Sequence, residues 1–190
     1  MSLLCQHSWL TNKLVDYFAD EIPDGPALKT SDSEHNCLLH CIGSTTPLEV
    51  VKRLVFRDRD ALKTPNKHGD LPLHCCVALN IETAAQLLLS KFPEAAGRPN
   101  NDGEFPVHMM DESISPELVE KLYLAGPAAF RTVTESGDTV IHRCVEAGVT
   151  CEVLKLVIEY NPERSLIFSG NTQTRPVSPI AMGIGFCTTI

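Results

Sequence analysis

The sequence is poor in basic residues. Its 190 residues include 16 Lys and Arg against 24 Asp and Glu, which gives a net charge of −8. Because contacts to phosphate groups need Lys and Arg, this deficit argues against a nucleic-acid-binding protein. No apolar run approaches the ~20 residues that a membrane-spanning helix needs, and the first residues lack the basic region of a signal peptide. We therefore expect an intracellular protein, cytoplasmic or nuclear, with no nucleic-acid or membrane partner.

The chain also lacks any Asn-x-Ser/Thr glycosylation acceptor, although it contains eight cysteines. In a small secreted protein, eight cysteines would predict four disulfides. Because the other marks of secretion are missing, we expect reduced thiols, which pack as small apolar side chains.

A spacing of 34 residues recurs along the chain. Four of the seven histidines are separated by this number, a glycine lies five residues before three of them, and a leucine lies fourteen residues after each. A further apolar column lies three residues before the leucines, which puts both columns on one face of a helix. The sequence therefore predicts a repeat array. The repeated positions are His40, His74, His108 and His142; Gly69, Gly103 and Gly137; Leu54, Leu88, Leu122 and Leu156; and Val51, Ala85, Val119 and Val153.

Each repeat is predicted to form a polar turn followed by two helices. Glycine supplies the positive φ that such a turn needs, and Pro72 and Pro106 suit the first turn of a helix. We expect a short first helix to end near Leu79, Glu112 and Ala147, and a longer second helix over 47–57, 83–92, 116–125 and 151–160. The predicted fold is all-α, a stack of helix-turn-helix repeats with short turns between units. The predicted units, all in one domain, are a partial repeat or cap at 1–34, repeats at 35–68, 69–102, 103–136 and 137–170, and a partial repeat or cap at 171–190.

The phrases Gly69-Asp-Leu-Pro-Leu-His-Cys-Cys76 and Gly137-Asp-Thr-Val-Ile-His-Arg-Cys144 resemble the unit pattern of ankyrin-repeat proteins, here with 34 residues per unit. This resemblance implies a solenoid that acts as a protein-binding module or scaffold. A tetratricopeptide array shares the period, but its Trp/Gly/Tyr spacing is absent. Ile42 and Met110 replace the small residue two positions after the histidine, so the units at 35–68 and 103–136 are expected to be less regular.

The Cys and His groups at His40-Cys41, His74-Cys75-Cys76 and His142–Cys144 could in principle bind zinc. Stacked units would place these groups ~10 Å apart, too far for bonds of ~2 Å to one ion. The favoured interpretation is that each histidine hydrogen-bonds turn backbone between units. No nucleophile, base and orienting group stand apart from the repeat, so we predict no catalytic residue, metal ligand or cofactor, and no enzyme.

Charged residues are expected to gather on the turns and on the first helices, where stacking would join them into an acidic stripe. Such a stripe would favour another protein with a basic or mixed-charge surface, although a merely solvated rim is the alternative. A further alternative is a targeting or regulatory fragment of a longer, possibly enzymatic protein. The candidate contact residues are Lys67, His68, Asp70, Asp102, Glu104, Asp111, Glu112, Glu135, Asp138, Arg143 and Glu146.

Overall fold

The computed structural model describes residues 31–161, and this part of the chain is all-helical, with no strand. The predicted caps at 1–34 and 171–190 therefore lie wholly or almost wholly outside the described residues, as does the end of the unit at 137–170. The α-helices are α2 (Leu48–Arg57), α3 (Pro72–Ala78), α4 (Glu82–Lys91), α5 (Pro116–Ala125), α6 (Val140–Ala147) and α7 (Cys151–Tyr160). The one-turn 3₁₀ helices are η3 (Leu38–Cys41), η4 (Asp60–Lys63), η5 (Pro93–Gly97), η6 (Pro106–Met109) and η7 (Pro127–Arg131).

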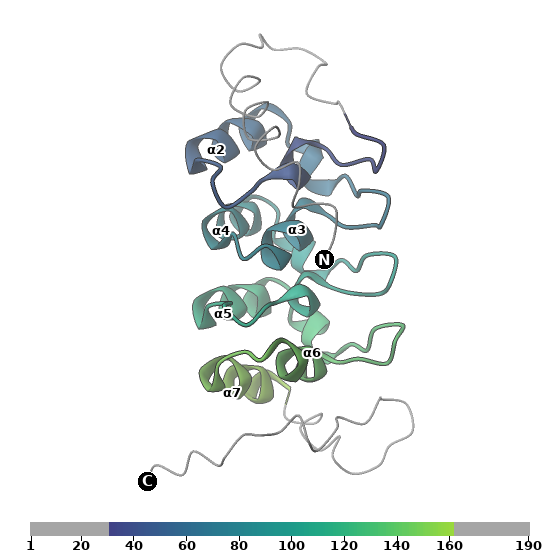
Figure 1. The fold of residues 1–190 in the computed structure, drawn as a ribbon, viewed down its shortest axis with the longest axis vertical. Coiled ribbons are helices and arrows are strands. Elements are labelled where there is room, and N and C mark those ends of the chain that lie inside the picture. Colours follow the sequence, from purple (N-terminus) through teal and green to yellow (C-terminus); the bar gives the residue numbers. More distant parts are fainter. Residues whose placement is uncertain (1–30, 162–190) are drawn as a thin grey trace.

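The helices form two adjacent columns, shown in Figure 1. One column contains the longer helices α2, α4, α5 and α7, each packed against the next. The other contains α3 and α6 together with the short helices η3 and η6. The turns between units project from the side of the stack away from the longer helices.

Local sequence sets where these helices begin and end. Ser115 caps α5, since its hydroxyl accepts a hydrogen bond from the Leu118 N–H at 3.1 Å, and a proline at the first position of a helix forgoes no hydrogen bond. Asn80, with φ of 50°, follows α3, and Gly148, with φ of 70°, ends α6. Both are residue types that tolerate this left-handed conformation.

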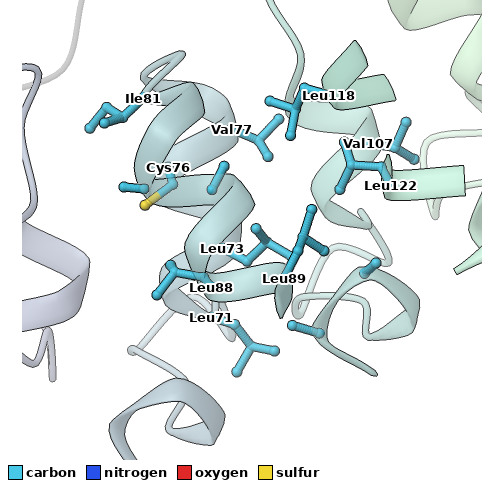
Figure 2. Close-up of a cluster of buried hydrophobic side chains, with 14 of the residues drawn as sticks. Leu71, Leu73, Cys76, Val77, Ile81, Leu88, Leu89, Val107, Leu118 and Leu122 are labelled. Atoms are coloured by element: carbon cyan, nitrogen blue, oxygen red, sulfur yellow. The ribbon is translucent and has the colours of Figure 1, made fainter. Parts of the chain in front are cut away.

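The core lies between the two columns and between successive helix pairs. Leu54, Leu88 and Leu122 are buried, whereas Leu156 in the last described helix is half-buried. Figure 2 shows Leu73 of α3 and Leu88 of α4 within one cluster of buried side chains. Full burial of a leucine contributes about 1.5–3 kcal/mol, so these columns account for much of the stability of the stack.

The unit at 103–136 departs from the predicted pattern. Its first helix was expected to run to Glu112, but η6 ends at Met109 and the backbone of Met110 is extended, with ψ of 148°. Met110 is buried where the other units place the smaller Cys76 and Cys144, and its sulfur lies 3.6 Å from that of Cys144. We attribute the short helix to the space that this larger side chain needs. The unit at 35–68 departs in the same way, because Ile42 follows η3 in an extended conformation.

Candidate functional site

Four turns of the same geometry lie along one edge of the stack, at residues 32–36, 66–70, 100–104 and 134–138. In each, the backbone N–H of the first residue donates to the carbonyl of the fifth, and the fourth N–H donates to the first carbonyl. The first side chain is Asp32, Asn66, Asn100 or Thr134, and its oxygen accepts one or two N–H groups of its own turn. This column also repeats at 34 residues and was missed by the sequence analysis; a search for Asp, Asn and Thr at that spacing would have found it.

The fourth residue of each turn has a left-handed backbone. Gly69, Gly103 and Gly137 have φ values of 80°, 73° and 86°, and His35 occupies the same position in the first turn with φ of 59°. A Cβ atom at Gly69 would also lie 2.6 Å from the backbone nitrogen of Asn101. Glycine is therefore required there both by the backbone conformation and by the close approach of the next turn.

The turns are hydrogen-bonded to one another. The N–H of Lys67 donates to the carbonyl of Glu34 at 2.8 Å, that of Asn101 to His68 at 3.0 Å, and that of Glu135 to Asp102 at 3.3 Å. Because each turn is held by its own bonds and by its neighbour, the row presents its side chains in a fixed arrangement. A surface ordered in advance loses less conformational entropy when a partner binds.

The repeated histidines lie next to this row and hydrogen-bond to its backbone or to the start of the following helix. In each of the four histidines, Nδ1 accepts a hydrogen bond from the backbone N–H of the residue three positions earlier. His40 and His74 donate from Nε2 to the carbonyls of Asp70 at 2.8 Å and Glu104 at 3.2 Å, which matches the role that the sequence analysis favoured. Burial lowers the pKa of both imidazoles, so the neutral tautomer with its proton on Nε2 is the one that fits.

The expectation that each repeated histidine hydrogen-bonds the neighbouring turn is wrong for His108. Within the described residues its Nε2 has no hydrogen-bond partner. Burial, together with the Arg143 cation, lowers the pKa of His108 to about 4, and Asp138 opposes part of this shift. This imidazole is therefore held neutral by its surroundings.

The acidic candidates divide by exposure. Asp102, Glu112, Glu135 and Glu146 are exposed, as are Lys67 and His68, whereas Asp70, Glu104, Asp111 and Arg143 are half-buried. The expectation that Asp138 is accessible is wrong, because it is only 5% exposed. Its Oδ2 accepts a hydrogen bond from the Ser136 hydroxyl at 2.7 Å, and the fold of the last described turn places it inward.

Two further candidates lie elsewhere than expected. Asp111 and Glu112 were expected on a first helix, but they follow the end of η6 because Met110 interrupts it. Asp111 instead closes a local turn, in which its Oδ1 accepts the N–H of Ser113 at 2.9 Å and the Ser113 hydroxyl at 2.8 Å.

The charges of the row partly neutralise one another. Lys67 and His68 lie 3.3 and 3.7 Å from the Glu34 carboxylate. Arg143 forms an ion pair with Glu104 and lies 3.4 Å from Glu146. Asp70 accepts a hydrogen bond from the Asn100 side chain at 2.9 Å, so it also links two turns. The surface is thus a mixed-charge row. Among the candidate residues, Asp102 and Glu135 are exposed acids on the turns and Glu112 and Glu146 are exposed acids beside them, while Asp32 of the first turn is exposed as well.

The partly or fully buried cysteines of the described residues are held as thiols. Burial raises the pKa of the Cys41 thiol to about 11 and those of Cys75 and Cys144 to about 12. Cys37 lies 3.0 Å from His40 Nδ1, but burial raises the pKa of this thiol and lowers that of the imidazole. The proton therefore stays on sulfur, and a thiolate, the reactive form, is disfavoured.

The described residues contain no group of three or more His, Cys, Asp or Glu placed to hold a metal ion. Among the helices of this part of the chain, none is long and apolar enough to cross a membrane.

Comparisons with known proteins find a similar fold but no family. No family model matches the chain, and no curated protein does. One solved structure with a similar chain is described as the Bd0816 predatory endopeptidase from Bdellovibrio bacteriovorus in complex with immunity protein Bd3460. The match has a TM-score of 0.60 at 14% identity and covers 85% of this chain and 82% of that chain. At this identity the likeness concerns the fold alone.

The comparisons contradict the assignment to the ankyrin-repeat family. No family model supports it, and the similar solved structure is described by an endopeptidase and an immunity protein. The physical reason lies in the motif itself. Glycine at positive φ and proline at a helix start meet the local demands of a tight turn leading into a helix. Short phrases built from such residues describe local geometry and do not identify a family.

Proposed function

We propose that this chain is a solenoid-type protein-binding module that contacts its partner through the row of turns at 32–36, 66–70, 100–104 and 134–138. The observation that carries the proposal is the ladder of backbone hydrogen bonds between successive turns. This ladder fixes an extended edge whose exposed side chains are free to vary without disturbing the core. Within residues 31–161 no group of three or more His, Cys, Asp or Glu is placed to hold a metal ion, and burial raises the pKa of the thiols of Cys41, Cys75 and Cys144.

The exposed charges indicate the chemistry of the partner. The exposed acids Asp102, Glu112, Glu135 and Glu146 lie on the later turns and beside them, and the exposed Lys67 lies on the turn at 66–70. Such a surface favours a protein with a basic or mixed-charge face, because complementary potentials raise the association rate and exclude wrong partners. The similar solved structure is itself described as a complex of two proteins, which supports a role in protein–protein association.

The test compares two variants, each with three acidic residues replaced by their amides, so that both lose the same amount of negative charge. The first neutralises exposed acids on the row and directly beside it, with Asp102→Asn, Glu112→Gln and Glu135→Gln. The second neutralises three exposed acids away from the row, on η5, α5 and α7, with Glu94→Gln, Glu120→Gln and Glu152→Gln. Proteins captured from a cell extract by the unchanged chain are purified, and their affinities are measured by titration calorimetry.

We expect the first variant to bind at least about tenfold more weakly, a loss of about 1.4 kcal/mol. The second variant should bind as the unchanged chain does, and the difference should shrink at high salt because screening weakens exposed charges. If both variants bound the captured partner equally well, the charges of the row would be exposed to solvent without contributing to binding.

A further inference from the structure

Three buried polar atoms at one junction of the stack have no hydrogen-bond partner among residues 31–161. They are Nε2 of His108, Oδ1 of Asp138 and Nε of Arg143. His108 is 1% exposed and Asp138 is 5% exposed, and the three residues lie at the boundary between the unit at 103–136 and the unit that follows it. Nearly all buried polar atoms in folded proteins have a partner, so three exceptions at one boundary point to a bound group that they share.

The repeat places these atoms beside one another. At the two earlier junctions, histidine Nε2 donates to the carbonyl of the residue thirty positions later, and the residue thirty positions after His108 is Asp138. Arg143 reaches the same place, because its guanidinium forms an ion pair with Glu104 of the preceding turn. Burial is the main cause of the lowered pKa of His108, and the charges of Arg143 and Asp138 also act on it. The imidazole, the carboxylate and the guanidinium therefore meet in one small region.

Direct contacts between turns are fewer at this junction than at the earlier ones. Asn66 and Asn100, the first residues of the second and third turns, each donate from the side-chain amide to the turn before, at 3.1 and 2.9 Å. The corresponding residue of the last turn is Thr134, whose hydroxyl bonds instead to Ser136 of its own turn at 2.8 Å. The backbone bond from Glu135 to the preceding turn is also the longest of the three, at 3.3 Å. A bridging group would supply the contact that the earlier junctions make directly.

The hydrogen-bonding character of the three atoms defines the group that fits between them. Nδ1 of His108 accepts the Phe105 N–H at 3.2 Å, so the proton of the neutral imidazole is on Nε2, which is a donor. Arginine Nε is also a donor, whereas the Asp138 carboxylate only accepts. The second oxygen of that carboxylate already accepts from the Ser136 hydroxyl at 2.7 Å. The bound group must therefore accept two hydrogen bonds and donate one.

A water molecule meets this requirement, and an ion does not. Water has two lone pairs and two protons, and a buried water typically makes about three hydrogen bonds to polar groups that are otherwise unsatisfied. A metal cation would face two N–H donors, and an anion would lie against the carboxylate of Asp138.

We propose that His108, Asp138 and Arg143 hold one ordered water molecule between the last two described units. The water accepts hydrogen bonds from His108 Nε2 and Arg143 Nε and donates one to Asp138 Oδ1. It replaces the direct bond from histidine to carbonyl of the earlier junctions and fixes the turn at 134–138 to the rest of the row. The residues at the position of Arg143 in the two preceding units are Cys75 and Met109, which carry no side-chain N–H group, so the site is specific to this junction. The proposal concerns how the stack is held together and does not depend on the proposed function.

The experiment uses the full chain in solution and in crystals. NMR measures the transfer of magnetisation from water to the carbon-bound Hε1 proton of each repeated histidine, which adjoins Nε2 but does not itself exchange with solvent during the measurement. His74 is the internal control, because its Nε2 donates directly to the Glu104 carbonyl at 3.2 Å. The same measurement is made on Arg143→Met, which removes one of the three partners and introduces the residue found at position 109. Circular dichroism verifies that this variant folds. A crystal structure of the unchanged chain, with bromide in place of chloride, identifies the bound group.

We expect the transfer from water to be at least about fivefold stronger at His108 than at His74, because a buried water with three partners stays in place. Arg143→Met should reduce the transfer at His108 to the level of His74. The crystal structure should show one peak about 2.7–3.2 Å from all three atoms, without an anomalous signal from bromide. Equal transfer at both histidines, or transfer at His108 that Arg143→Met leaves unchanged, would overturn the proposal. So would a direct bond from His108 Nε2 to the Asp138 carbonyl, or a bromide ion at the site. If Arg143→Met fails to fold, the crystal structure and the comparison with His74 decide the question.

Discussion

Acid should destabilise the described stack, and His108 should carry a measurable part of the effect. The imidazole is 1% exposed, and its Nδ1 accepts the Phe105 N–H at 3.2 Å. Burial, assisted by Arg143, lowers its pKa to about 4 from the value of 6.5 expected in the unfolded chain. Between these two values the unfolded chain binds a proton that the native protein does not. The free energy of unfolding therefore falls as the pH drops through this window.

The size of the effect follows from the two pKa values. Each unit of difference corresponds to about 1.4 kcal/mol once both forms are protonated. Between pH 7 and pH 5 the contribution of His108 should be a loss of about 2 kcal/mol, rising to about 3 kcal/mol near pH 4.

The assay is urea unfolding followed by circular dichroism at pH 7 and pH 5, at constant ionic strength, for the unchanged chain and His108→Asn. The Asn side chain keeps an acceptor for the Phe105 N–H but does not titrate. Whatever the variant costs at pH 7, it should lose about 2 kcal/mol less than the unchanged chain on going to pH 5. The exposed His68→Asn serves as the control and should retain the full loss. Equal pH dependence of the unchanged chain and His108→Asn would refute the reasoning.

Two further predictions concern the columns of the repeat. The Leu88 side chain is only 1% exposed, so Leu88→Ala should lower the free energy of unfolding, measured in urea, by about 2–5 kcal/mol. Leu79→Ala, at an exposed position, should lower it far less. A loss of unfolding free energy below about 0.5 kcal/mol for Leu88→Ala would contradict the helix register. His35→Gly should stabilise the protein by up to about 1 kcal/mol, because His35 has φ of 59° where the other turns have glycine. Ser33→Gly in the same turn lacks that strain and should give no gain in thermal unfolding temperature.

Much of the helical framework could be predicted from the sequence because its signals are local. The expected helices at 116–125 and 151–160 coincide with α5 and α7, and the helix expected at 83–92 differs from α4 by one residue at each end. The side chains of Ser115 and Thr150 cap the starts of α5 and α7. Such caps and the periodic apolar residues set the helix boundaries by signals that lie within each helix or next to it. The early end of η6 depended instead on how Met110 packs against Cys144 of the next unit. A contact of that kind does not follow from the local pattern.

The candidate surface was less predictable, for a related reason. The acidic residues were placed on the turns from the repeat alone, but the repeat does not say which carboxylates the neighbouring unit covers. Asp138 is buried and Glu104 is engaged by Arg143, and both facts depend on the packing of one unit on another. The family assignment failed because its motif describes turns and helix starts, which unrelated stacks also need.

The repeat itself indicates where function should be sought. A position that holds the same residue in every unit, such as the histidine column, meets a structural demand that every unit shares. In this case Nδ1 of each histidine accepts the backbone N–H three residues earlier. A position where units differ is released from that demand. Arg143 replaces the Cys75 and Met109 found at the same place in earlier units, and Lys91 becomes Ala125 in the next. Each substitution adds or removes a charge at a partly or fully exposed position. The turns share one backbone geometry, whereas their exposed side chains differ from unit to unit. Variation between units, more than the shared pattern, should therefore determine what this protein binds.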